Sequence, residues 1–173
     1  MTPPIEEFVF SHPELPREFD IQLWAFARLV WGENLRGDAR FRTGSWDDPP
    51  PTHFVRVAGA LLISHALVLP LSFEADRGAL RVGAVGAVLT FPQFRGEGHA
   101  SALMRRAAEH IGETADVGML FCDARNVPFY ERLGWNALPP GRVLVNGEVR
   151  DDIVMILGDG DIVPDPFRLS RAW

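Results

Sequence analysis

The chain has 173 residues, 47% of them hydrophobic, and this size predicts one domain, residues 1–173, built around one core. All 17 basic residues are arginine, which excludes P-loop NTPase chemistry because that chemistry needs a lysine, and the net charge of -6 argues against nucleic-acid binding. No apolar run approaches the ~20 residues of a membrane span, residues 1–10 carry no basic leader, and the lone Cys122 suits a reducing compartment, so we expect a cytoplasmic protein without nucleic-acid or membrane partners.

The first half of the chain predicts one helix and three strands. Helical spacing within residues 16–34 places five apolar side chains on one face: Phe19, Leu23, Phe26, Ala27 and Val30. The polar segment 32–52 predicts a loop with at most one helical turn. Strands are expected at residues 53–57 and 60–73, joined by a hairpin turn at 58–59, and again at residues 78–91.

The second half predicts a long amphipathic helix after residue 98, because six apolar side chains recur at helical spacing: Ala100, Leu103, Met104, Ala107, Ala108 and Ile111. A strand at 117–122 and a short helix ending at Gly134 follow. Residues 143–149 and 151–157 read as a final strand pair, and residues 158–173 as an acidic tail that ends in Trp173. This order predicts an α/β (α+β) fold with a mixed, mostly antiparallel sheet flanked by helices.

The stretch FPQFRGEGHAS, residues 91–101, carries two glycines between an apolar strand and that helix. Such a turn directs several N–H groups outward at the positive end of a helix dipole, which favours a phosphate or pyrophosphate. Arg95, His99 and Ser101 could add donors. An ordinary strand–helix turn is the alternative. A dinucleotide site, with Asp123 as the ribose-binding acid, is disfavoured because Ser101 replaces the third glycine of that motif.

Arg95, Gly98 and Ala100 fit the pattern Q/R-x-x-G-x-G/A, and NVPFYERLGW follows about thirty residues later. Together these segments resemble the two central motifs of the GNAT N-acetyltransferases over about residues 80–136. The resemblance implies the GNAT fold and acetyl-CoA as cosubstrate, without a metal. It implies a cofactor-binding set of Val88, Leu89, Thr90, Arg95, Gly96, Glu97, Gly98, His99, Ala100, Ser101 and Asn126. In that family the strand backbone binds the pantetheine arm and the turn binds the pyrophosphate.

The resemblance also places the only tyrosine, Tyr130, where the family carries its general acid, which protonates the departing thiolate. Many members have a glutamate base in the preceding strand, where this chain has Gly86 and Ala87. Water relayed by backbone carbonyls could serve instead, as could one of four side chains: Glu74, Asp76, His65 or Asp152. His65 reads better as a core histidine, and Cys122 as a buried thiol rather than an acyl-accepting nucleophile.

These features predict direct acetyl transfer to a primary amine in a ternary complex. The layout is loosely similar to the aminoglycoside 2′-N-acetyltransferases, so we expect a small polycationic acceptor. Its expected site residues are Asp38, Gly86, Ala87, Asp151, Asp152 and Trp173. Two alternatives stay open: a non-catalytic acyl-CoA-binding module used for sensing, and transfer to a polyamine, an amino acid or a protein N-terminus. A homodimer is also left open.

Overall fold

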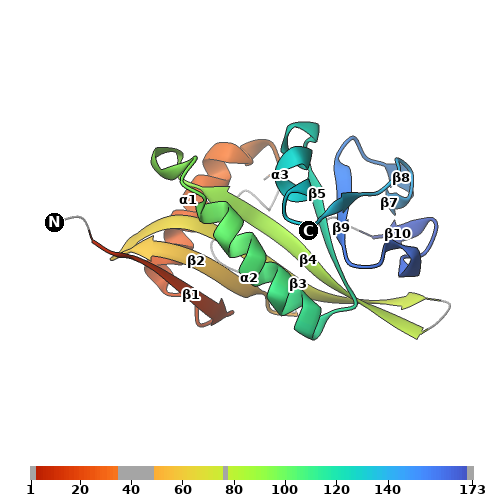
Figure 1. The fold of residues 1–173 in the computed structure, drawn as a ribbon, viewed down its shortest axis with the longest axis horizontal. Coiled ribbons are helices and arrows are strands. Elements are labelled where there is room, and N and C mark those ends of the chain that lie inside the picture. The colour runs from red at the N-terminus through yellow and green to blue at the C-terminus, as the bar shows by residue number, and fades with distance from the viewer. Residues whose placement is uncertain (1–2, 35–48, 76–77, 171–173) are drawn as a thin grey trace. The chain divides into compact units, whose positions relative to one another are not determined.

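The computed structural model describes residues 3–34, 49–75 and 78–170 (Figure 1). The helices are α1 (Arg17–Val30), α2 (His99–Thr114) and α3 (Val127–Glu131). The strands are β1 (Ile5–Ser11), β2 (Thr52–Ala58), β3 (Leu61–Ala75), β4 (Gly78–Thr90), β5 (Val117–Cys122), β6 (Asn136–Ala137), β7 (Val143–Val145), β8 (Glu148–Val149), β9 (Ile153–Leu157) and β10 (Phe167–Leu169). Single 3-10 turns lie at Gly32–Asn34, Pro92–Phe94, Ala124–Asn126 and Gly160–Ile162.

The strands form two sheets, one in the order β1-β2-β3-β4-β5-β9-β6 and one in the order β10-β7-β8. In the larger sheet, β4 and β5 are parallel, whereas β1 and β2, β5 and β9, and β6 and β9 are antiparallel. The α/β fold with a large, mostly antiparallel sheet is therefore confirmed.

The chain divides into two compact units, and each is built from two separate segments. Unit 1 comprises Met1–Leu67 and Ala87–Arg106, and unit 2 comprises Val68–Gly86 and Ala107–Trp173. The long strands β3 and β4 and the helix α2 each contribute residues to both units. That the whole chain is a single domain stays a prediction.

The core of unit 1 forms where α1 packs on its strands. Phe19, Leu23 and Phe26 are buried, as their helical spacing predicts, and they join Leu15, Val55, Val57, Leu62 and Leu89. Two more residues were expected on the same face: Ala27 is half-buried, and Val30, the last residue of α1, is exposed. The Gln22 side chain accepts a hydrogen bond from the Leu62 N–H (2.9 Å) and donates one to the Ala60 carbonyl (2.8 Å). This pair of bonds fixes α1 against the start of β3.

Strand β1 was not predicted from the sequence. It pairs antiparallel with β2 along its full length, from Ile5 opposite Ala58 to Ser11 opposite Thr52. The sequence IEEFVFS lacks the alternation of apolar and polar residues that identifies a half-buried strand. In the structure its side chains are all exposed or half-buried. Backbone hydrogen bonding to β2, rather than burial, defines this strand.

In unit 2 the expected pairing of residues 143–149 with 151–157 is wrong. Residues 143–149 form their own hairpin, in which β7 and β8 are joined by Asn146 and Gly147 at positive φ (54° and 81°). Asn-Gly favours this tight turn because both residues adopt left-handed conformations at low cost. Strand β9 pairs instead with β5 and β6.

The segment after β9 was predicted to be an acidic tail, but its described part is packed. Strand β10 runs parallel to β7, and the Arg142 guanidinium donates to the Val163 carbonyl (2.9 Å). Val163, Phe167 and Leu169 are buried in a core that also contains Leu80, Val82, Val117, Met119, Val143, Val145 and Ile156. Apolar side chains at these positions therefore complete the core of unit 2.

Two glycines face each other where β4 pairs with β5, Gly83 opposite Gly118. A Cβ atom at Gly83 would lie 2.7 Å from Ile111 Cγ1 of α2. At Gly118 it would lie 2.9 Å from Trp135 Cη2 and 3.1 Å from Leu157 Cβ. Neither position has room for a side chain, so these glycines permit close packing against the β4–β5 pair.

We expect Gly118→Ala to lower the free energy of unfolding by about 1–3 kcal/mol, because the added methyl group overpacks a rigid indole and a Cβ atom. Gly112→Ala in α2 is the matched control. A Cβ there meets no atom within 4 Å, and the helix gains roughly 0.5–1 kcal/mol from replacing glycine. Urea denaturation of both variants checks the pair, and equal stabilities would contradict the packing argument.

Candidate functional site

A strand–turn–helix segment in unit 1 connects β4 to α2. The chain leaves Thr90, makes a 3-10 turn over Pro92–Phe94, and bends at Gly96 and Gly98 before α2 begins at His99. Both glycines have positive φ, 85° and 82°. The turn therefore requires glycine for its backbone conformation, since other L-residues adopt this region only with strain.

The same glycines border open space. A Cβ atom built at Gly96 or Gly98 meets no atom within 4 Å. The Gly98 carbonyl accepts the first hydrogen bond of α2, from Ala102 N–H (3.0 Å). Within an α-helix the first N–H groups have no intrahelical partner, so those at the start of α2 remain available beside this space. An anion can approach them, helped by the helix dipole.

Two side chains of the turn bond to the protein itself. Exposed Arg95 donates through Nε to the Thr90 carbonyl (3.1 Å), which folds it back over the end of β4. His99 is buried, and its Nδ1 lies 3.2 Å from an Arg56 guanidinium nitrogen while its Nε2 lies 3.3 Å from Glu97 Oε2. Guanidinium only donates, so Nδ1 accepts and Nε2–H donates to Glu97. At this turn, both ring nitrogens of His99 are engaged.

Further side chains engage the carbonyls at the end of β4. Buried Ser64 of β3 donates to the Leu89 carbonyl (2.7 Å) and accepts from the Thr90 hydroxyl (2.9 Å). His65, the next residue, donates to the Ala87 carbonyl (2.9 Å). This polar support for Ala87–Thr90 was not predicted from the sequence, because nothing in the local pattern links residues 64 and 65 to a strand more than twenty positions away.

Ala87 has a left-handed backbone, with φ of 47°, in the middle of a strand. Upstream, in unit 2, the ladder between β4 and β5 joins Val82–Ala84 to Val117–Met119, whereas β5 runs on to Cys122. Gly86 and Ala87, the residues that stand in place of the family's glutamate, are half-buried. A kinked strand of this kind departs from regular sheet geometry near the point where it leads into the glycine turn.

Two fully buried histidines, His53 and His65, are linked to this strand through the Ala87 carbonyl. His53 Nδ1 and His65 Nε2 are 2.9 Å apart, and burial lowers the pKa of His65 to about 4 and that of His53 to about 3, the latter also through repulsion from His65. Both rings are therefore neutral at physiological pH. Because the His65 side chain has no solvent exposure, it cannot take a proton directly from a substrate.

Tyr130 of unit 2 lies on the short helix α3, as expected, and Asn126 stands exposed just before that helix. The Tyr130 ring packs at an angle on Phe129 and Trp135, with centroids 4.9 Å and 6.4 Å away. Burial, followed by the neighbouring Cys122, raises the pKa of the phenol above its usual value. Tyr130 is therefore protonated at neutral pH and can donate a hydrogen bond.

Cys122 is buried at the end of β5. Burial, then the charges of Asp123 and Asp152, raise the pKa of its thiol to about 11. Nucleophilic cysteines act as thiolates, which this environment disfavours. The buried thiol fits the role predicted from the sequence, which was not that of a nucleophile.

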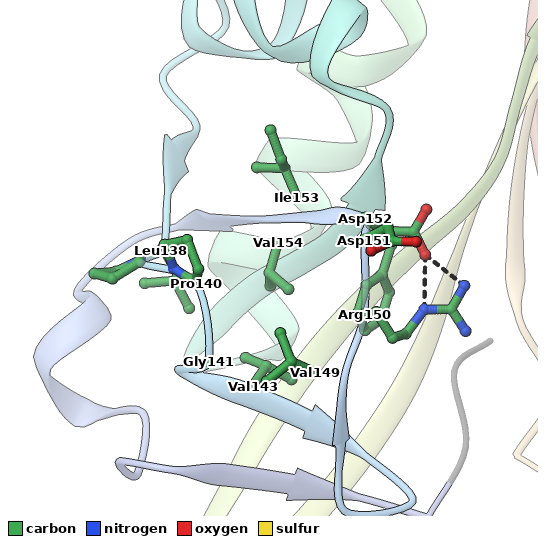
Figure 2. A pocket seen from close by; sticks show the side chains of 12 residues that line it. Leu138, Pro140, Gly141, Val143, Val149, Arg150, Asp151, Asp152, Ile153 and Val154 are labelled. Carbon is green, nitrogen blue, oxygen red and sulfur yellow. Dashed lines mark hydrogen bonds and ion pairs between the residues drawn. The ribbon is translucent and has the colours of Figure 1, made fainter.

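Asp151 and Asp152 line a groove of about 140 Å³ in unit 2, between the β6–β7 connection and the β8–β9 connection (Figure 2). Asp152 forms an ion pair with Arg150, whose Nε donates to Asp152 Oδ2 (2.7 Å). Arg150 also lies over the Phe121 ring, 5.8 Å from its centroid. Arg150 thus offsets one of the two acidic charges, and Asp151 remains exposed at the groove.

Four more residues were named as candidates for the base or the acceptor site. Three of them, Asp38, Asp76 and Trp173, lie outside the described residues. Glu74 is exposed on β3 in unit 2. Within residues 3–34, 49–75 and 78–170, no group of three or more His, Cys, Asp or Glu side chains could hold a metal ion. Among the helices of the same residues, none combines the length and the hydropathy that a membrane span requires.

A family model described as an acetyltransferase (GNAT) domain matches residues 42–138, a range that includes the glycine turn and Tyr130. A comparison with curated protein sequences gives no match.

Solved structures share the fold. An acyl-CoA N-acyltransferase from Pseudomonas aeruginosa has a TM-score of 0.61 at 18% identity and covers 89% of this chain and 99% of its own. Escherichia coli ElaA gives 0.62 at 21% identity, with the same coverage. An aminoglycoside 6′-N-acetyltransferase in complex with coenzyme A gives 0.63 at 14% identity, covering 86% of this chain and 95% of its own. Because the family match spans more than half of the 173 residues, the chain belongs to the GNAT acetyltransferase family.

Proposed function

We propose that the protein transfers the acetyl group of acetyl-CoA to a primary amine of a small, polycationic acceptor. One observation carries this proposal: the two left-handed glycines border open space beside the N–H groups at the start of α2. The family match over the same residues supports acetyl-CoA as the anion that enters this space.

The turn fits a pyrophosphate in its chemistry. The backbone N–H groups from Gly96 to Ser101 supply donors, the helix dipole supplies positive potential, and Arg95 lies beside them as a cation. The His99 imidazole is engaged by Arg56 and Glu97, so we assign its contribution to the backbone N–H. Val88, Leu89 and Thr90 would hold the pantetheine arm through their backbone, with Asn126 as a further contact.

We infer direct transfer, without an acyl-enzyme. The only cysteine has a buried thiol whose pKa is raised to about 11, which makes it a poor nucleophile at neutral pH. Acetyl-CoA supplies the activated thioester, and Tyr130 donates a hydrogen bond to the sulfur as it leaves. Of the base candidates, His65 is fully buried and Asp152 is paired with Arg150. We assign removal of the amine proton to water, held near Gly86 and Ala87 by backbone carbonyls other than that of Ala87, which accepts from His65.

The acidic groove favours an amine carrying more than one positive charge. Asp151 is exposed there and Asp152 stands beside it, so a cationic acceptor would be attracted and oriented. Asp38 and Trp173 remain part of the proposed acceptor site. The fold likeness to an aminoglycoside 6′-N-acetyltransferase supports testing aminoglycosides first. We expect the reaction to take place in the cytoplasm.

A panel of amines, with acetyl-CoA and a reagent for free thiols, tests the proposal. We expect CoA release with aminoglycosides or other polyamino compounds, and much slower release with neutral amino acids or peptide N-termini. Tight acetyl-CoA binding without CoA release for any amine would instead favour the non-catalytic binding module. A neutral amino acid or a peptide as the best acceptor would contradict the polycationic assignment.

Asp151→Asn should raise the KM for a polycationic amine about two- to fivefold at low salt, the effect of losing one exposed charge pair. The difference from wild type should shrink as ionic strength rises, because such pairs are screened over ~8–10 Å. Asp161→Asn, an equal charge change at an exposed residue outside the groove, is the control and should leave KM unchanged. Steady-state kinetics at two salt concentrations measures both, and identical behaviour of the two variants would rule out the groove as the acceptor site.

A further inference from the structure

Two histidines in the interior of unit 1 end in a hydrogen bond to one backbone carbonyl, and their proton positions follow from simple chemistry. The Ala87 carbonyl only accepts, so His65 Nδ1 carries the hydrogen that bonds to it at 2.9 Å. His65 Nε2 is then an acceptor, and His53 Nδ1–H donates to it at 2.9 Å. One arrangement of protons satisfies both contacts, and it runs from His53 through His65 to Ala87.

Burying two histidines in a protein core costs more free energy than burying apolar side chains. Both histidines have no solvent exposure, and burying a polar group carries a penalty unless its hydrogen bonds are made. Burial lowers the pKa of each ring, so the pair stays neutral, and the Ala87 carbonyl, which only accepts, sets the tautomers. Apolar side chains would fill the same volume without that penalty. The bond to Ala87 is what the pair adds.

Ala87 is a residue that needs such support. With φ of 47° it occupies the left-handed region, where a residue with a Cβ atom is strained. Its methyl group packs beside the buried cluster of α1, β2 and β3, so the side chain as well as the carbonyl is held in place. A strained backbone conformation of this kind is kept only where several surrounding contacts hold it in place.

The orientation of this carbonyl determines the next N–H. In a trans peptide the C=O and N–H groups point in opposite directions, so turning the Ala87 carbonyl toward His65 turns the Val88 N–H away from it. Val88 begins the backbone segment that the proposed function assigns to the pantetheine arm. The carbonyls of Leu89 and Thr90, in the same segment, are engaged by Ser64 and Arg95.

We propose that His53 and His65 form a positioning pair, which holds the left-handed Ala87 peptide and thereby orients the backbone that receives the acyl-pantetheine arm of acetyl-CoA. The proposal rests on the proposed function, because it names residues that prepare its cosubstrate site. Neither histidine touches the substrate. Both act through the main chain.

The test compares two ligands by calorimetry: acetyl-CoA, and 3′-phospho-ADP, the nucleotide half of CoA that lacks the pantetheine arm. His65→Leu removes the donor to Ala87. We expect at least tenfold weaker binding of acetyl-CoA, about 1.4 kcal/mol, with the affinity for 3′-phospho-ADP within twofold of wild type. A role limited to general packing would weaken both ligands equally, and that outcome would overturn the proposal.

A second pair of variants keeps the core polar. Asn places an amide N–H near the position of the histidine Nδ1, whereas Gln places it near Nε2. His65→Asn should therefore retain acetyl-CoA affinity within about threefold, and His65→Gln should lose it. Equal affinities for the two, in proteins with native circular dichroism and similar melting temperatures, would overturn the proposal. Failure of the wild-type protein to bind either ligand would overturn the proposed function itself.

Adding Ala87→Gly to His65→Leu probes the cause. Glycine adopts the left-handed conformation without strain, so the double variant should recover at least threefold of the lost acetyl-CoA affinity. No recovery would show that His65 acts other than through the Ala87 backbone.

Discussion

Tyr130→Phe is expected to lower kcat by ~10²–10⁴-fold, the range typical of a positioned proton donor. The substitution keeps the aromatic packing on Phe129 and Trp135 and removes only the hydroxyl. Because the thiolate that leaves acetyl-CoA has a conjugate acid with a pKa near ~8.5, a protonated phenol beside it stabilises the developing charge. The loss should fall on kcat, while the dissociation constant for acetyl-CoA stays close to that of wild type.

Cys122→Ala is the matched variant for this experiment. Cys122 is the second contributor, after burial, to the raised pKa of the Tyr130 phenol, and it is also the only thiol in the chain. Direct transfer predicts turnover within about threefold of wild type for Cys122→Ala. Loss of activity in this variant would instead indicate an acyl-cysteine pathway, and a Tyr130→Phe effect below threefold would return the tyrosine to a packing role.

Gly98→Val should weaken acetyl-CoA binding by at least ten- to a hundredfold. Its φ of 82° is strongly disfavoured for a β-branched residue, so the turn must change and its N–H groups lose their common direction. A Cβ atom at this position meets no protein atom within 4 Å, so the new side chain also projects into the space assigned to the pyrophosphate. Calorimetric titration of the folded variant with acetyl-CoA measures the loss.

Gly59→Val separates backbone strain from ligand contact. Gly59 joins β2 to β3, has φ of 59°, and likewise has no atom within 4 Å of a built Cβ. The Gly59→Val variant should lose stability as Gly98→Val does, yet it should bind acetyl-CoA with nearly wild-type affinity. Unchanged affinity in folded Gly98→Val would remove the glycine turn from the cosubstrate site.

Elements whose burial repeats with a clear period were predictable. In α2 the helical spacing identified six apolar positions, of which four are buried, Leu103, Met104, Ala107 and Ile111, and two are half-buried, Ala100 and Ala108. Elements defined by pairing between distant segments were not. Strand β10 is three residues in a segment rich in Gly, Asp and Pro, and only its parallel partner β7 makes it a strand. Pairing of this kind depends on the assembled core rather than on local sequence.

The candidate site divides in the same way. The glycine turn and Tyr130 follow motifs with fixed local spacing, so sequence reasoning placed them on the elements where they lie. The contacts that hold the turn and the strand before it join residues far apart in the chain, such as Arg56 with His99 and His65 with Ala87. Sequence periodicity could identify His65 as buried, but no pattern in one chain predicts which carbonyl it meets.

Unit 1 is built from two chain segments separated by residues 68–86, so its core cannot be completed until the second segment has been synthesised. Its buried cluster joins Leu15 and Phe19, near the start of the chain, to Leu89 at the end of β4. The ribosome makes residues 68–86, which belong to unit 2, before it reaches Leu89. The nascent chain must therefore carry an incomplete apolar cluster for more than seventy codons after Leu15, a period in which chaperones would have exposed hydrophobic surface to bind.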